Sequence, residues 1–77
     1  MYYTIATMED LSAKQSLKIN KNGNKYDVCL YDRDISKFTR KTFATIEEAE
    51  QAFLKIASCF IHGVYSAKDR AKMLLDC

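Results

Sequence analysis

The stretch SLKINKNGNKYDVCLY, residues 16–31, decides the fold, because it places two alternating segments on either side of an Asn-Gly pair. Asn22-Gly23 is typical of a two-residue type I′ turn, in which both central residues need a positive φ. A turn at that position pairs Lys18 with Asp27 across the hairpin. Alternation along both segments then gathers the apolar side chains on one face, which carries Leu17, Ile19, Tyr26, Val28 and Leu30.

A long helix is predicted between Thr45 and Gly63. Thr45 is suited to cap its start, with Glu48 at the spacing of a capping box, and Gly63 is typical of a C-terminal stop. Apolar side chains recur at steps of three and four and cover an arc of roughly 220°, about twice what one sheet face requires. We therefore expect this helix to contact more than the sheet.

Two further strands complete the predicted sheet. Tyr2–Thr7 is rich in aromatic and β-branched residues and predicts an edge strand, with a short helical turn after it over residues 7–11. Lys37–Phe43 predicts the last strand. If Phe43 points into the core, alternation places Lys41 on the same face, where a buried ammonium is costly. That face must then be wet at this end, or the strand must bulge.

A short second helix closes the chain. Ser66 and Asp69 have the spacing of a helix cap and its third residue, and the stripe after them is wide enough to dock on the long helix. We expect an α+β fold in which an antiparallel sheet of three or four strands, built around the central Asn-Gly hairpin, is packed on one side by both helices. The 77 residues contain no proline, repeat or low-complexity linker, so residues 1–77 are predicted to form a single domain.

Composition narrows the function classes. The net charge is +2, which argues against both a strongly basic nucleic-acid clamp and an acidic DNA mimic. The three cysteines are odd in number and irregularly spaced, and the chain starts without a basic region followed by an apolar one. Both features favour the cytoplasm of a host cell. No apolar run approaches the ~18 residues that span a bilayer, so we expect no membrane partner.

Residues that could carry chemistry do not form a complete motif. Cys59 and His62 supply one Cys-x-x-His pair, whereas a structural zinc site needs four converging ligands. Asp32 and Asp34 match the start of a calcium loop, but its glycine and distal glutamate are missing. The glutamates that open the long helix suit the positive end of its dipole. The sequence therefore predicts no catalytic residue, metal or cofactor, and the protein is not expected to be an enzyme.

The face of the sheet turned away from the long helix is the candidate binding surface. Aromatic and arginine side chains on a rigid platform are the usual anchors of protein interfaces. Three other interpretations stay open: a plain solvent face, a face covered by the first strand, and a homodimer contact. The predicted partner-binding residues are Lys18, Lys25, Tyr31, Phe38 and Arg40, with Tyr3 or its neighbour Tyr2 joining them.

The chain resembles the small phage-encoded anti-CRISPR proteins, in particular the type I-F inhibitor, which has a similar length and sheet-plus-helix order. The resemblance covers about residues 16–55 and rests on Ile19, Asn22-Gly23-x-Lys25, the strand from Val28 to Tyr31, and Phe43-Ala44-Thr45-x-Glu47 leading into Phe53. It implies a non-enzymatic inhibitor that occludes a host CRISPR-Cas complex, a protein or ribonucleoprotein partner. Where the inhibitor uses tyrosines and a glutamate for contact, this chain has Ala6, Asn20 and Tyr31.

A second resemblance leads to another function. Three strands followed by a helix that packs across them also look like the AP2-like and integrase arm-binding domains, whose outer sheet face enters the major groove of DNA. Under that resemblance Lys18, Lys25, Arg40 and Arg33 would contact phosphates or base edges. Those domains are usually more basic than this chain. DNA binding by the sheet face is therefore the alternative function.

Overall fold

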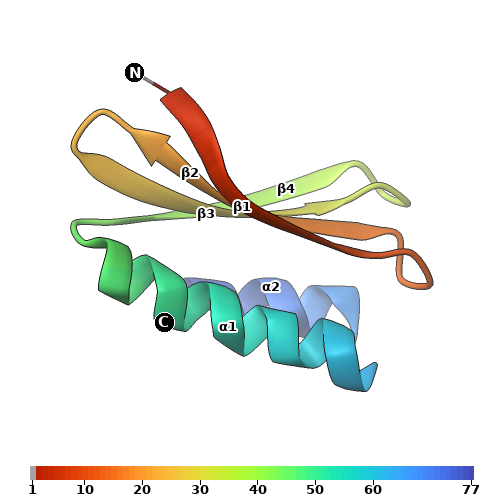
Figure 1. The fold of residues 1–77 in the computed structure, drawn as a ribbon. Helices are drawn as coiled ribbons and strands as arrows, with labels where there is room; N and C mark the ends of the chain where they lie inside the picture. Colours follow the sequence, from red (N-terminus) through yellow and green to blue (C-terminus); the bar gives the residue numbers. More distant parts are fainter. Residues whose placement is uncertain (1) are drawn as a thin grey trace.

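The computed structural model describes residues 2–77, which form a four-stranded antiparallel sheet and two helices (Figure 1). The strands lie in the order β1-β2-β3-β4, so each pairs with its neighbour along the chain. Both helices lie on the same side of the sheet, which confirms the predicted fold class. The elements are β1 Tyr2–Asp10, β2 Gln15–Asn22, β3 Lys25–Asp32, β4 Lys37–Phe43, α1 Ile46–His62 and α2 Ala67–Leu75.

The central hairpin turns one residue later than predicted. Asn22 pairs with Lys25, so the loop residues are Gly23 and Asn24, and only Gly23 has a positive φ, of 64°. A glycine of this kind at the first loop position is typical of a type II′ turn. The shift moves Lys18 opposite Cys29, so the predicted pair with Asp27 is wrong. The faces are unchanged, because one residue at the turn shifts the partners by two, and the predicted apolar face lies in or against the core.

The first strand is longer than predicted. β1 pairs with β2 as far as Asp10, which faces Gln15, so the helical turn predicted over residues 7–11 is wrong. Pairing along β2 satisfies the backbone groups of this segment, which a single helical turn would leave mostly unbonded. A bulge between Thr4 and Ala6 interrupts the register. After it, Ala6 and Met8 pack against the core.

Lys41 of the last strand, β4, contacts the C-terminal end of α2. Thr39 and Phe43 are buried on the helix side, and Lys41 lies between them. The Lys41 ammonium donates to the backbone carbonyl of Leu75 at 3.0 Å and also to that of Cys77. The C-terminal end of a helix carries partial negative charge and exposed carbonyls, which suit a cation. The two expected solutions were a wet face and a bulge; the end of α2 supplies the partner instead.

The predicted helix caps are confirmed. Thr45 accepts a hydrogen bond from the Glu48 backbone N–H at 3.3 Å, and Gly63 ends α1 with a φ of 63°. Ser66 caps α2 in the same way. The second helix contacts both β4 and α1, so it packs on the sheet as well as on the long helix. Part of the apolar arc of α1 is left exposed, including Leu54 at 62%.

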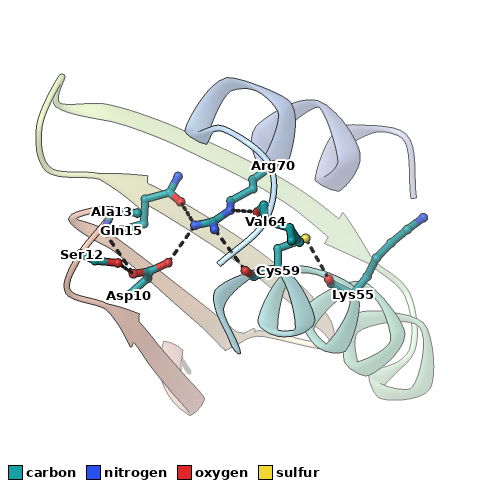
Figure 2. Close-up of polar contacts among 8 residues, drawn as sticks. All are labelled: Asp10, Ser12, Ala13, Gln15, Lys55, Cys59, Val64 and Arg70. Carbon is teal, nitrogen blue, oxygen red and sulfur yellow. Dashed lines mark hydrogen bonds and ion pairs between the residues drawn. The ribbon is translucent and has the colours of Figure 1, made fainter. Parts of the chain in front are cut away.

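A buried arginine joins the two layers. Arg70 of α2 is 3% exposed and donates to the Asp10 carboxylate at 3.0 Å and to the Gln15 side-chain oxygen at 2.9 Å (Figure 2). Its other donors reach the backbone carbonyls of Cys59 at 3.1 Å and Val64 at 3.0 Å. One guanidinium therefore connects the β1–β2 end of the sheet, the end of α1 and the start of α2. Nothing in the sequence analysis singled out this residue.

Asp10 is held as a carboxylate by several donors. The Ser12 hydroxyl donates to it at 2.7 Å and the Ala13 N–H at 3.1 Å, and Arg70 approaches its other oxygen. The pKa of Asp10 is lowered, chiefly by the Ser12 hydrogen bond, with Ala13 and Arg70 acting in the same direction and burial opposing them. The charged form of Asp10 therefore stabilises the fold.

Replacing Arg70 by lysine tests this network. An ammonium cannot reach four acceptors arranged around a planar guanidinium, so buried oxygens lose their donors, and we expect Arg70→Lys to lower the free energy of unfolding by about 2–4 kcal/mol. The matched control is Arg33→Lys, because Arg33 forms a solvent-exposed ion pair with Glu9 at 2.7 Å. This control is expected to cost less than about 1 kcal/mol in urea unfolding. Equal losses of unfolding free energy in Arg70→Lys and Arg33→Lys would show that the buried network stabilises the fold no more than an exposed ion pair does.

Acid titration tests the role of Asp10. Its folded pKa lies below the ordinary value of about 3.9, so its contribution is complete above that value and is lost as the pH falls through the lower folded pKa. We expect Asp10→Asn to be less stable at neutral pH but to lose less further stability than the wild type below about pH 4. Unfolding curves at a series of pH values measure this. Parallel pH profiles for the two proteins would contradict it.

Candidate functional site on the outer sheet face

The outer face is defined here as the side of the sheet opposite α1 and α2. No helix covers it in the described part of the chain, and β1 extends the sheet at its edge instead of crossing it. The register of β2, β3 and β4 arranges its side chains in rows across the strands. The three central rows are Ser16–Tyr31–Phe38, Lys18–Cys29–Arg40 and Asn20–Asp27–Thr42.

The structure brings most of the predicted binding residues together. Tyr31 and Phe38 are cross-strand neighbours, and Lys18 and Arg40 occupy the adjacent row. Lys25 lies on the same face at the hairpin end of the sheet. These five predicted residues therefore share one surface.

Tyr3 does not belong to this surface. It faces Lys21, which lies on the same face of β2 as the core residue Ile19, so Tyr3 points to the helix side. Its neighbour Tyr2 lies on the outer face. The sequence could not decide between the two tyrosines, because no tight turn near residue 2 fixes the register of β1 in that segment. The placement of Tyr3 in the binding surface was wrong.

A shallow hollow of about 350 Å³ lies in the middle of the outer face. Because the Cys29 side chain is small, nearly buried and placed between Lys18 and Arg40 in its row, we assign it to the floor of the hollow. Phe38 and Tyr31 rise beside it and are 56% and 37% exposed, so an incoming group can reach both rings. The lining residues are Tyr2, Thr4, Ser16, Lys18, Asn20, Cys29, Tyr31 and Phe38.

Hydrogen bonds hold the floor and one wall of the hollow. The buried Asn20 amide donates to the Tyr2 hydroxyl at 2.8 Å, and the Thr4 hydroxyl donates to the Asn20 carbonyl oxygen at 2.8 Å. A tyrosine whose hydroxyl is fixed in this way loses little further freedom on binding, which favours affinity. Sequence analysis named Asn20 only as a position in the resemblance to anti-CRISPR proteins, and it did not single out Thr4, although alternation along the strands could have indicated both.

The thiol in the floor is not activated. Burial raises the pKa of the Cys29 thiol, and the negative charge of Asp27 acts in the same direction, against Arg40 and Lys18. A raised pKa keeps the thiol protonated near neutral pH, whereas nucleophilic cysteines are thiolates. Cys29 is therefore suited to shape the hollow and poorly suited to attack a substrate.

The acidic groups of the outer face are already bound within the protein. Asp27 is fully buried and accepts hydrogen bonds from the Thr42 hydroxyl at 2.6 Å and the Asn22 amide at 3.3 Å. Glu9 accepts from Arg33 at 2.7 Å. Three basic residues of this face have no ion-pair partner anywhere in residues 2–77. These are Lys18, Lys25 and Arg40.

The residues considered for metal binding do not converge. Cys59 is buried in α1, and its thiol contacts the Lys55 carbonyl at 3.4 Å, whereas Cys29 lies on the outer face of the sheet. Residues 2–77 contain no group of three or more histidine, cysteine or acidic side chains placed to hold a metal ion.

The helices described here include none that is long and apolar enough to cross a membrane.

Comparisons with protein-family models, with curated proteins and with solved structures found no match to this chain. Its function is therefore inferred from the geometry and charge of the outer face.

Truncating the two exposed aromatic residues tests whether they are structural. We expect Tyr31→Ala and Phe38→Ala to lower the free energy of unfolding by about 1 kcal/mol or less, because each loses mainly a cross-strand contact. Leu30→Ala, which empties a fully buried position of the same sheet, should cost about 2–5 kcal/mol. Urea unfolding of the three variants compares them. Losses for Tyr31→Ala or Phe38→Ala as large as for Leu30→Ala would make that aromatic residue part of the core.

Proposed function

We propose that this chain is a non-enzymatic protein-binding module that acts by occluding a partner surface with its outer sheet face. The observation that carries the proposal is the exposed pair Tyr31 and Phe38 beside a preformed hollow with unpaired basic residues next to it. Aromatic and arginine side chains in such positions dominate the energetics of many protein interfaces. On the outer face, the Asp27 and Glu9 carboxylates are hydrogen-bonded within the chain, and the raised pKa of the Cys29 thiol favours its protonated form.

The resemblance to small anti-CRISPR proteins supports a more specific form of this proposal. The partner would be a host CRISPR-Cas complex, and the protein a phage or mobile-element inhibitor acting in the host cytoplasm. The inhibitor that it resembles also binds its target through its sheet. Of the three corresponding positions, Ala6 faces the helices and Asn20 is buried, so Tyr31 is the one available for contact. The contacts with the target would therefore be made largely by other residues, including Phe38.

DNA binding remains the second candidate function. It is favoured by Lys18, Lys25 and Arg40, which are spread over the outer face without acidic partners among the described residues. Phosphate contacts give a binding constant that falls steeply with salt, with a slope of about 0.9 for each phosphate neutralised. DNA binding would therefore be visible as a strong salt dependence and as loss of partners after nuclease treatment.

Affinity capture from host cells tests the protein-binding function. The tagged wild type should retain a stoichiometric protein complex that survives nuclease, because its contacts are made by protein surfaces. Tyr31→Ala and Phe38→Ala should each weaken capture by about thirtyfold or more, as expected for interface anchors. Quantitative mass spectrometry and titration of the purified partner measure this.

Leu54→Ala is the matched control, since Leu54 is an equally exposed apolar residue on the helix side, at 62% against 56% for Phe38. It should capture the partner as the wild type does. Loss of capture in Leu54→Ala alone would move the binding surface to α1. Partners that disappear with nuclease would favour DNA binding, and a purified chain that is dimeric only when Phe38 is intact would identify a second copy as the occupant.

A further inference from the structure

Basic side chains without ion-pair partners among the described residues lie near the centre of the outer face. Its two carboxylates, Asp27 and Glu9, are engaged by partners from the chain itself. Lys18 and Arg40 lie in one row on either side of Cys29, and within residues 2–77 neither forms an ion pair. A group that binds over Cys29 therefore meets a cation from each side.

The geometry of that row fits a small anion. Neighbouring strands are about 4.8 Å apart, so the backbones of Lys18 and Arg40 are separated by about 10 Å. Both side chains are long enough to converge on a group between them, above the thiol of Cys29. A guanidinium binds a carboxylate through two parallel N–H donors, and an ammonium adds a third. The neutral Cys29 thiol adds no negative charge of its own, and the Asp27 carboxylate in the next row is buried and hydrogen-bonded by Thr42 and Asn22.

An apolar site adjoins this cationic row. Tyr31 and Phe38 form the next row, one on each of the strands that carry Cys29 and Arg40. Tyr2 closes the hollow from the β1 side, with its hydroxyl bound by Asn20. A ligand that fills the hollow therefore needs an anionic group and an apolar or aromatic group side by side.

We propose that the partner is an acidic protein segment that places a carboxylate between Lys18 and Arg40 and an apolar side chain against Tyr31 and Phe38. This inference rests on the protein-binding function proposed above and adds the chemistry of its partner. Lys25, at the hairpin end of the same face, would attract a further acidic residue of the segment. The charge of the face would speed association as well as strengthen binding.

The count of cations favours a protein over a nucleic acid. Proteins that grip duplex DNA through its backbone often neutralise about 6–10 phosphates. The outer face offers three cations without ion-pair partners in residues 2–77, which is fewer than such a DNA contact uses: Lys18, Lys25 and Arg40. The aromatic pair and the hollow instead match the compact anchors of protein interfaces.

Selection from a displayed library of random dodecapeptides tests the partner chemistry directly. Peptides selected on the wild-type protein should be enriched in Asp and Glu next to an aromatic or large aliphatic residue. Fluorescence anisotropy with the purified peptides then measures affinity for two double variants of equal charge change. Lys18→Glu with Arg40→Glu should weaken binding at least about tenfold, whereas Lys55→Glu with Lys68→Glu, on the exposed helix side, should change it by less than about twofold.

Other results would overturn the inference. Selected peptides without acidic residues, or peptides that bind the Lys18→Glu/Arg40→Glu variant as tightly as the wild type, would exclude an acidic partner. A single-stranded or duplex oligonucleotide that binds more tightly than the best peptide at about 0.15 M salt would assign the face to nucleic acid. Binding that is lost in Phe38→Ala but insensitive to both charge reversals would leave the protein-binding function standing and remove the acidic partner. Peptides whose affinity is unchanged by Tyr31→Ala, by Phe38→Ala and by both double charge reversals would contradict the protein-binding function as well as the acidic partner.

Discussion

The buried guanidinium of Arg70 is the interaction on which the rest of the structure depends. It is bonded to the β1–β2 end of the sheet through Asp10 and Gln15 and to the end of α1 through the Cys59 carbonyl. Its removal would leave these buried oxygens without donors, which costs more than the bonds themselves contribute. Arg70 also holds α2 in the same layer as α1. Both helices therefore pack on the same side of the sheet.

An open outer face follows from that arrangement. A chain of 77 residues can form little more than one hydrophobic core, and in this chain that core lies between the sheet and the two helices. The outer face keeps its structure without a covering layer because its polar groups satisfy one another: Asn20 holds Tyr2 and Thr4, and Asp27 is bound by Thr42. The exposed aromatic pair and the unpaired cations are not needed for that purpose. They are therefore the residues free to bind a partner.

The features that the sequence predicted correctly are set by short-range rules. Alternation assigned the faces of β2 and β3, and the caps at Thr45 and Ser66 and the stop at Gly63 fixed both helices. The hairpin register was missed because Asn22-Gly23 and Gly23-Asn24 both satisfy a tight turn, of types I′ and II′ respectively. Arg70 was missed because its partner Asp10 lies 60 residues away, and the Lys41 contact because its acceptors lie in α2. The common face of Lys18, Tyr31, Phe38 and Arg40 could be predicted, because alternation along the strands determines it once Phe43 is placed in the core.

The measurement that tests the outer face most directly is site-specific photo-cross-linking in cells that express the protein, with a benzoyl-phenylalanine placed either at Phe38 or at Leu54. The two positions are similarly exposed but lie on opposite sides of the molecule, on β4 and on α1. If the outer face binds the partner, position 38 gives a discrete protein adduct and position 54 gives none. An adduct from position 54 with none from position 38 would show that the helix layer binds the partner and that the outer face is only a solvated sheet surface.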